Sequence, residues 1–377
     1  MSHEDKKVVW VLGAGFSEGL GGPLLPSLLS ERAANDVAHR FPEDRFPELY
    51  KHPADKVRKL YWGRVIDSNL RPHGVTPQER VWSNAEDFID YLDAATVDNV
   101  LAARVNTMFE GKGPTAKALT AAARRLIAAE CSVFLYVGST EQEKWSSYFR
   151  WAKAIRPTDT IISFNYDRVL ENLFEKIGNA FVKLPSSSPS EGKDRCGILK
   201  LHGSVAWRKT LPGGTIGQSA DPVFALTTIA AEEIVMATPG PTKAATVTHD
   251  LSQLWDHAEW ALNAADAIVF LGYRFPETDA HARERLLGAI KANQGSSARM
   301  LLPIHIVLGS SPGSDRHAAR LSAMLEFACL AAGRTNVTGL RANAYNSIPL
   351  FRISSHPMFA QDFLSVVQRP DLFPPER

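Results

Sequence analysis

The sequence has few cysteines, little net charge and no long apolar run, and each of these absences excludes a class of protein. The three cysteines among 377 residues, Cys131, Cys196 and Cys329, lie far apart with no Cys-x-x-Cys pair, so we predict neither a zinc module nor a disulfide framework. This cysteine usage fits a reducing cytosol. A formal net charge of +1 provides no basic field for nucleic acid. The polar start of the chain is unlike a signal peptide, and no stretch reaches the roughly 18 apolar residues that span a bilayer. We expect a cytoplasmic protein without a membrane segment.

The length and the 45% hydrophobic content predict a large α/β core with an insertion or second lobe. Apolar strands that lead into turns and helices recur along the chain. They lie at 8–12, 160–164, 197–201, 267–271 and 302–308. Repeated units of this kind predict a doubly wound (Rossmann-like) parallel sheet. We assign residues 1–35 and 156–377 to the sheet domain and residues 36–155 to an inserted, mostly helical lobe.

The insertion contains helix signals separated by irregular sequence. Ser27 is a candidate N-cap for a first helix, and the prolines and charges between residues 40 and 77 predict an irregular excursion. The segment 84–93 predicts an amphipathic helix capped by Asn84, because its apolar residues recur at helical spacing. A further alanine-rich helix is predicted over about 115–129.

The first strand, 8–12, ends at two glycines, Gly13 and Gly15, which are separated by one small residue. Glycines at such a turn let the backbone approach a phosphate and leave amides of the next helix free to bind it. The third glycine of the full dinucleotide fingerprint is missing, since Glu18 takes its place. The alternative is a tight connection between strand and helix that binds nothing.

Polar residues follow the second strand, where Asn165 and Asp167 precede a helix. In open α/β sheets the ligand lies beyond the carboxyl ends of the strands, so both residues are expected to face the same crevice as Gly13 and Gly15. Alternatively, Asp167 caps the helix and Asn165 forms the turn.

Two later strands end in the same manner. His202 with Gly203 follows the strand at 197–201, and histidine can exchange a proton near neutral pH. Its alternative is a structural role in the turn. After the strand at 267–271, Gly272 could let backbone pass a ligand, and Tyr273 or Phe275 could stack on an adenine ring or pack in the core.

Four motifs in this order resemble those of the sirtuin-like NAD-binding fold. They are GAGFS at 13–17, SFNYD at 163–167, LHGS at 201–204 and LGYRFPETD at 271–279. The resemblance is closest to the bacterial sirtuin-like proteins of antiviral defence. The protein deacylases carry a four-cysteine zinc module that this chain cannot supply, and their first loop differs from Leu24-Leu25-Pro26 after Gly22-Pro23.

The resemblance implies that the chain binds NAD without a metal. It places the pyrophosphate near Gly13, Ala14, Gly15 and Ser17, and the nicotinamide riboside toward Asn165, Asp167 and His202. Gly272 and Tyr273 belong to the same cofactor-binding set. Asn165 and His202 are the implied catalytic residues, because an amide can position water or a ribose hydroxyl and an imidazole can act as general base. Asp167 either stabilises charge on the sugar or fixes the carboxamide.

The resemblance further implies an NAD hydrolase that depletes NAD in abortive infection. It implies a homo-oligomer and regulation by a partner, either a hexameric HerA-type ATPase or a short Argonaute, with no direct nucleic-acid binding. The alternative function is a non-catalytic NAD- or ADP-ribose-sensing subunit of a defence complex. A Rossmann dehydrogenase is disfavoured, because the acidic residue expected about 20 positions past the glycine turn would fall in an apparent helix.

Overall fold

The computed structural model describes residues 5–62, 82, 84–107, 114–136, 142–188, 191–209, 214–219, 226, 230, 233–238, 243, 246–277, 279–293, 301–336 and 350–373. Its centre is an eight-stranded sheet in the order β10-β11-β9-β8-β1-β2-β4-β3. All the paired strands in this sheet run parallel. The strands are β1 (Val8–Leu12), β2 (Thr160–Ser163), β3 (Ala180–Val182), β4 (Cys196–Lys200), β8 (Ala267–Leu271), β9 (Leu301–Val307), β10 (Thr335–Asn336) and β11 (Leu350–His356).

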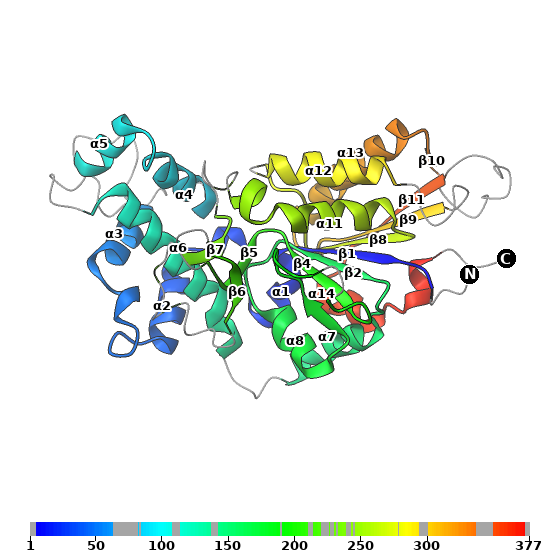
Figure 1. The fold of residues 1–377 in the computed structure, drawn as a ribbon, viewed down its shortest axis with the longest axis horizontal. Coiled ribbons are helices and arrows are strands. Elements are labelled where there is room, and N and C mark those ends of the chain that lie inside the picture. Colours follow the sequence, from blue (N-terminus) through cyan, green and yellow to red (C-terminus); the bar gives the residue numbers. More distant parts are fainter. Residues whose placement is uncertain are drawn as a thin grey trace.

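Helices cover both faces of this sheet (Figure 1). One face packs against α11 (Ser252–Asn263), α12 (Ala280–Lys291) and α13 (Ser314–Ala331). The other packs against α7 (Gln142–Ala154), α8 (Val169–Ile177) and α14 (Ala360–Val366). Side chains of β1 alternate between the two cores, so Val9 and Val11 face one layer while Trp10 and Leu12 face the other. The predicted doubly wound parallel sheet is confirmed, and its strands appear as continuous apolar runs because both faces are buried.

Between β1 and β2 the described chain forms helices, as predicted for the insertion. After the short turn α1 (Ala14–Ser17), the helices are α2 (Glu31–Arg40), α3 (His52–Tyr61), α4 (Ala85–Ala94), α5 (Asn99–Thr107) and α6 (Ala116–Val133). They share a second hydrophobic cluster beside one end of the sheet, where Figure 1 shows α2 to α6 grouped together. Helix α7, also within the predicted insertion, instead contacts α8 and α14 beneath the sheet.

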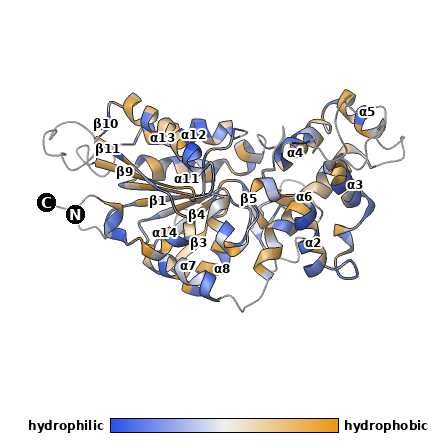
Figure 2. Cartoon of the chain, turned by 180° about the vertical axis from the view of Figure 1, so that it is seen from behind, coloured by the Kyte–Doolittle hydropathy of each residue, from blue (hydrophilic) through white to orange (hydrophobic). Residues whose placement is uncertain are grey.

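A small antiparallel sheet, β6-β5-β7, lies between the main sheet and this helical group. Its strands are β5 (Gly203–Lys209), β6 (Ile216–Gln218) and β7 (Ile234–Met236). Val205 and Met236 pack into the core of the helical group, whereas Trp207 packs into the core of the main sheet. The small sheet therefore joins the two cores. In Figure 2 the apolar residues gather along the strands and on the inward faces of the helices.

Local predictions for the insertion are partly confirmed and partly wrong. Asn84 does cap α4, since its side chain accepts a hydrogen bond from the Asp87 amide at 3.1 Å. The first helix, however, is capped by Ser30 and not by Ser27, because Leu29 between them has a φ of 57° that interrupts helical geometry. Helix α3 also forms inside the segment predicted to be irregular.

The sequence also predicted too few strands. The segment at 302–308 was expected to be the last strand, but β10 and β11 continue the sheet beyond β9. Within β11 the exposed side chains dilute the apolar pattern, because this strand lies near the edge of the sheet.

Candidate active site

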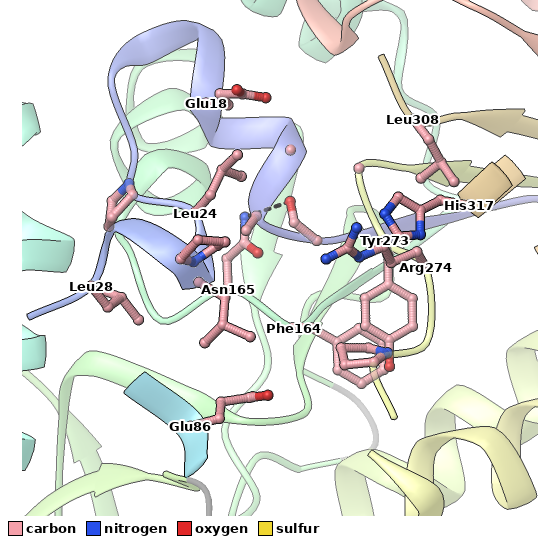
Figure 3. Close-up of a pocket in the computed structure, with 18 of the residues that line it drawn as sticks. Glu18, Leu24, Leu28, Glu86, Phe164, Asn165, Tyr273, Arg274, Leu308 and His317 are labelled. Carbon is pink, nitrogen blue, oxygen red and sulfur yellow. Dashed lines mark hydrogen bonds between the residues drawn. The ribbon is translucent and has the colours of Figure 1, made fainter. Parts of the chain in front are cut away.

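The carboxyl ends of β1, β2, β4 and β8 meet at a cavity of about 360 Å³. The chain leaves β1 toward β2 on one side and later reaches β8 on the other, so this edge is the topological switch point of the sheet. The insertion contributes Glu86 of α4, which lies across the cavity from Asn165 (Figure 3), and Cys131 of α6 also lines the cavity. Eight of the predicted site residues line the cavity: Gly13, Ala14, Gly15, Asn165, Asp167, His202, Gly272 and Tyr273. Ser17 lies behind this wall, fully buried.

The glycine turn packs backbone against backbone. A Cβ on Gly13 would lie 2.5 Å from the Gly272 carbonyl oxygen, and one on Gly272 would lie 2.4 Å from the Phe16 amide nitrogen. The Gly13 amide donates to Leu271 O at 3.1 Å, and the Gly15 amide donates to Gly272 O at 3.3 Å. The two glycines line the cavity as predicted, but their amides are not free for a phosphate, because the turn after β8 already uses them.

Asn165 is held by both hydrogens of its side-chain amide. Nδ2 donates to the Gly13 carbonyl at 3.0 Å, which Figure 3 marks, and to Ser17 Oγ at 3.1 Å. Ser17 in turn donates to Asp167 Oδ2 at 2.8 Å. Because a carbonyl accepts from Nδ2, the orientation of the amide is fixed, and Oδ1 remains as its unused acceptor among the described residues. Asn165 can therefore accept a hydrogen bond from water or a ribose hydroxyl, but it has no hydrogen left to donate.

Asp167 links the turn after β2 to the helix that follows. The N-cap of α8 is Arg168 and not Asp167, so the capping interpretation is wrong in its residue. Asp167 Oδ1 nevertheless accepts from the Val169 amide at 3.0 Å at the start of this helix, while Oδ2 accepts from Ser17 and the residue lines the cavity. Burial raises the pKa of Asp167, although the nearby Lys200 and these hydrogen bonds oppose the shift.

His202 follows β4 and is 7% exposed. Its Nε2 approaches Asp279 Oδ2 to 3.2 Å, an ion-pairing contact without the direction of a good hydrogen bond. Lys243 Nζ lies 3.3 Å from the other oxygen of Asp279. Burial, reinforced by Lys243, lowers the pKa of His202, while Asp279 opposes the shift. Burial alone would raise the pKa of Asp279, but His202 and Lys243 hold it well below its ordinary value. The arrangement is a neutral imidazole beside a carboxylate, as a general base requires.

The aromatic residues after β8 pack mainly against other protein groups. Tyr273 stacks on Phe164 with ring centroids 3.8 Å apart, and its hydroxyl donates to Asp279 Oδ2 at 3.1 Å. Phe275 is fully buried and belongs to the core. Of the two alternatives for Phe275, the core position is therefore the observed one.

Several cavity residues were not predicted from the sequence. Asp279 stands inside the fourth motif, where an acid just before a helix was a usable signal. Arg274 stands in the same motif but had no local signal of its own. His317, which lines the cavity, and Lys243, which contacts Asp279, come from parts of the chain outside the four motifs. Glu86, in the first turn of α4, faces the cavity across from Asn165 (Figure 3).

The described residues contain no group of three or more His, Cys, Asp or Glu side chains placed to hold a metal ion. No helix in the described part of the chain is both long enough and apolar enough to cross a bilayer.

Comparison with known proteins relates part of this chain to one family. Residues 159–326, a little under half of the chain, match the family described as a SIR2-like domain. This range includes Asn165, His202 and Gly272, whereas Gly13 and Gly15 lie outside it. A comparison with curated proteins finds no match.

One solved structure is titled "Structural Basis for the Mechanism and Regulation of Sir2 Enzymes". It is similar over 86% of this chain and 94% of its own, at 10% identity and a TM-score of 0.27. A TM-score this low does not establish a shared fold, so the fold assignment depends on the strand order of this chain. The match of residues 159–326 supports a sirtuin-like family for the part of the chain that contains β2 to β9.

Proposed function

We propose that this protein is an NAD hydrolase that releases nicotinamide and ADP-ribose. One observation carries the proposal: Asn165 and His202 follow different strands and line the same cavity as the Gly13–Gly15 turn. The SIR2-like match of residues 159–326 supports NAD as the ligand class. In this proposal residues 1–35 and 156–377 form the NAD-binding domain, and residues 36–155 form the inserted lobe.

The proposed reaction breaks the bond between the nicotinamide nitrogen and C1′ of the ribose. Water then forms a bond to C1′ and loses a proton, and nicotinamide leaves as a neutral molecule. His202 accepts this proton, since a neutral imidazole is available at pH 7. Asn165 Oδ1 accepts a hydrogen bond from the attacking water or from a ribose hydroxyl and so orients it. Asp279 stabilises the imidazolium that forms, in the way a carboxylate supports a catalytic histidine elsewhere.

The proposal includes a biological role in antiphage defence. The resemblance to defence proteins supports NAD depletion during phage infection, a homo-oligomer and activation by a HerA-type ATPase or a short Argonaute. The insertion is the structural feature through which such a partner can act, because α4 and α6 contribute Glu86 and Cys131 to the cavity wall.

The test is chromatographic analysis of products after incubation of the purified protein with NAD, alone and with each candidate partner. We expect nicotinamide and ADP-ribose in equal amounts. His202→Ala and Asn165→Ala should each lower turnover by at least about 100-fold, and both should stay folded at the assay temperature. Asn165→Ala should unfold at a lower temperature than the wild type, because it removes two buried hydrogen bonds. The matched control is His249→Ala, because the His249 side chain is 87% exposed and outside the cavity.

Wild-type turnover in both site variants would refute the site assignment. Binding of NAD without nicotinamide release, in the presence of the activating partner, would favour the sensing subunit. Acyl transfer from an acetylated peptide would instead identify a deacylase.

A further inference from the structure

One end of the cavity carries an arginine and a histidine whose side chains have no partner among the described residues. Arg274 follows β8 and His317 lies in the first turn of α13, and both line the cavity. Figure 3 shows them next to each other, at the end opposite Leu28. Among the described residues neither side chain has a hydrogen-bond or salt-bridge partner. Partial burial lowers the pKa of His317, and the charges of Arg274, Arg320 and Arg316 lower it further. The positive charge at this end therefore comes from the arginines, and the neutral His317 imidazole contributes a hydrogen-bond donor.

The turn that presents Arg274 is fixed. Gly272 is packed against the backbone of Gly15 and Phe16. Phe275 has a φ of 50°, which is unusual for a residue with a side chain and persists only where its surroundings enforce it. Here Phe275 is fully buried and its carbonyl accepts from Arg320 at 3.2 Å. Arg274 is therefore held at the cavity wall by a rigid loop.

The carboxylates among the described lining residues are Glu18, Glu86, Asp167 and Asp279, and none of them pairs with Arg274. Asp279 is on the same loop as Arg274, but its oxygens already contact His202, Lys243 and Tyr273. The described lining residues of the loop after β9 and of α13 include no acid, and Asp315 of the same turn is exposed and outside the cavity wall. An arginine that faces a cavity and pairs with none of its described carboxylates is suited to phosphate, which its planar fork binds through two hydrogen bonds.

The position of this basic end matches one half of a dinucleotide. Strand order places β8 and β9 on the far side of β1 from β4, where His202 stands. Four strand intervals separate β4 from β9, a span of about 19 Å, which suits two linked nucleosides better than one. Because the amides of Gly13 and Gly15 are already bonded, phosphate needs other donors along this path.

We propose that Arg274 and His317 form a phosphate subsite that binds the adenosine half of the dinucleotide. The inference rests on the proposed function, since it assumes that the nicotinamide end lies at Asn165 and His202. A phosphate at this place has two sources, the pyrophosphate of NAD or the additional 2′-phosphate of NADP. Both present the same chemistry to an arginine.

The experiment is isothermal titration of the full chain with four probes: NAD, NADP, nicotinamide riboside and inorganic pyrophosphate. The variants are Arg274→Gln and His317→Gln. Arg316→Gln is the matched control, because it removes a charge from the same turn of α13 but does not line the cavity. We expect Arg274→Gln to weaken NAD binding by about tenfold or more and to leave nicotinamide riboside, which has no phosphate, unchanged. Arg274→Lys should restore part of the affinity.

Comparison of the probes identifies the source of the phosphate. Tighter binding of NADP than of NAD, lost in His317→Gln, assigns the subsite to the 2′-phosphate. Equal loss of NAD and NADP in Arg274→Gln, with binding of pyrophosphate to the wild type, assigns it to the pyrophosphate. Either result supports the subsite.

Other outcomes overturn it. If Arg274→Gln weakens the binding of NAD and of nicotinamide riboside equally, Arg274 has a structural role. If Arg274→Gln and Arg316→Gln weaken NAD binding equally, the effect comes only from the overall positive charge of this region. NAD binding through Arg274 without nicotinamide release would refute the hydrolase and retain the subsite. Unchanged NAD affinity in Arg274→Gln, with normal nicotinamide release, would refute the phosphate subsite and retain the hydrolase. No binding of any probe would refute both.

Discussion

Lys200 and His202 stand two residues apart at the end of β4, and both are buried, yet their surroundings differ. Lys200 Nζ donates to the Asp167 carbonyl, to Glu171 Oε1 at 2.8 Å and to Ser204 Oγ at 3.0 Å, so its three hydrogens are all used. His202 lines the cavity, and among the described residues its imidazole has one close polar contact, with Asp279. Burial alone therefore does not identify a functional group. A group whose hydrogen bonds are complete supports the structure, whereas one that still faces a cavity can act on a ligand.

The complete set of partners explains what Lys200 does for the site. Its bond to the Asp167 carbonyl fixes the turn after β2, which also carries Asn165. Ser204 stands at the start of β5, so the same ammonium group connects the main sheet to the small sheet. Lys200 is thus a positioning residue behind the cavity wall.

The largest expected effect is on stability, from Lys200→Met. The substitution leaves the Glu171 carboxylate buried without its cation, which typically costs about 3–5 kcal/mol. Urea denaturation measures this change in the free energy of unfolding. The double variant Lys200→Met with Glu171→Gln should recover at least about 1 kcal/mol, because it removes the lone charge. A single variant as stable as the wild type would contradict the structural role of Lys200.

The second prediction concerns the pH dependence of activity, which depends on His202. Catalysis by a neutral imidazole declines as pH falls through the lowered pKa of His202. Lys243 lowers that pKa and Asp279 raises it, so Lys243→Gln should move the acid limb of the pH–rate profile to higher pH. Asp279→Asn should move it to lower pH and also reduce the maximal rate, on the order of 100-fold.

The measurement is nicotinamide release from pH 5 to 8 under saturating NAD. The control is Lys209→Gln, since Lys209 pairs with Asp250 away from the cavity. Shifts in the same direction for the Lys243 and Asp279 variants would show that another group controls the acid limb.

Much of the site could be predicted because it depends on one rule of parallel sheets. Strands that run the same way end at the same edge, so Asn165 and His202, far apart in sequence, were expected to converge, and they do. The sequence pattern of strands and turns could not show that Gly13 and Gly15 pack against Gly272. That contact depends on which strand lies beside β1, and strand order is set by tertiary packing.

The missed features share a different cause. Lys243 acquires its role from Asp279, which is distant in sequence, and no local pattern records that contact. Asp279 and Arg274 stand within the fourth motif, but the position of Asp279 beside His202 and of Arg274 at the cavity wall depends on tertiary packing. Strand β11, which lies next to the edge strand β10, was missed because its partly exposed residues lack an apolar run. Lys200 was overlooked inside an apolar strand, where only the structure shows the partners that permit its burial.

The smallest expected effect comes from Glu130, a third buried ionisable group that extends the comparison. Its carboxyl accepts one hydrogen bond, from the Leu29 amide at 2.8 Å, next to the cavity-lining Leu28. Burial raises the pKa of Glu130 from 4.5 to about 8, despite opposing effects of Leu29 and Arg58. Since the folded protein holds this proton more tightly than the unfolded chain, the stabilisation is full below pH 4.5 and is lost as pH rises through 8.

The wild type should therefore lose roughly 1 kcal/mol per pH unit between pH 6 and 8 from this group. Glu130→Gln cannot ionise and keeps the shape of the protonated acid, so this loss should disappear, while its stability at pH 6 stays within about 1 kcal/mol of the wild type. Urea midpoints at pH 6, 7 and 8 measure the slopes, with the exposed Glu143→Gln as control. Parallel slopes for wild type and Glu130→Gln would mean that Glu130 is ionised in the folded protein. One amide and a nearby arginine would then be enough to keep a buried group charged. The complete hydrogen bonds of Lys200 would no longer distinguish a structural buried charge from a functional one.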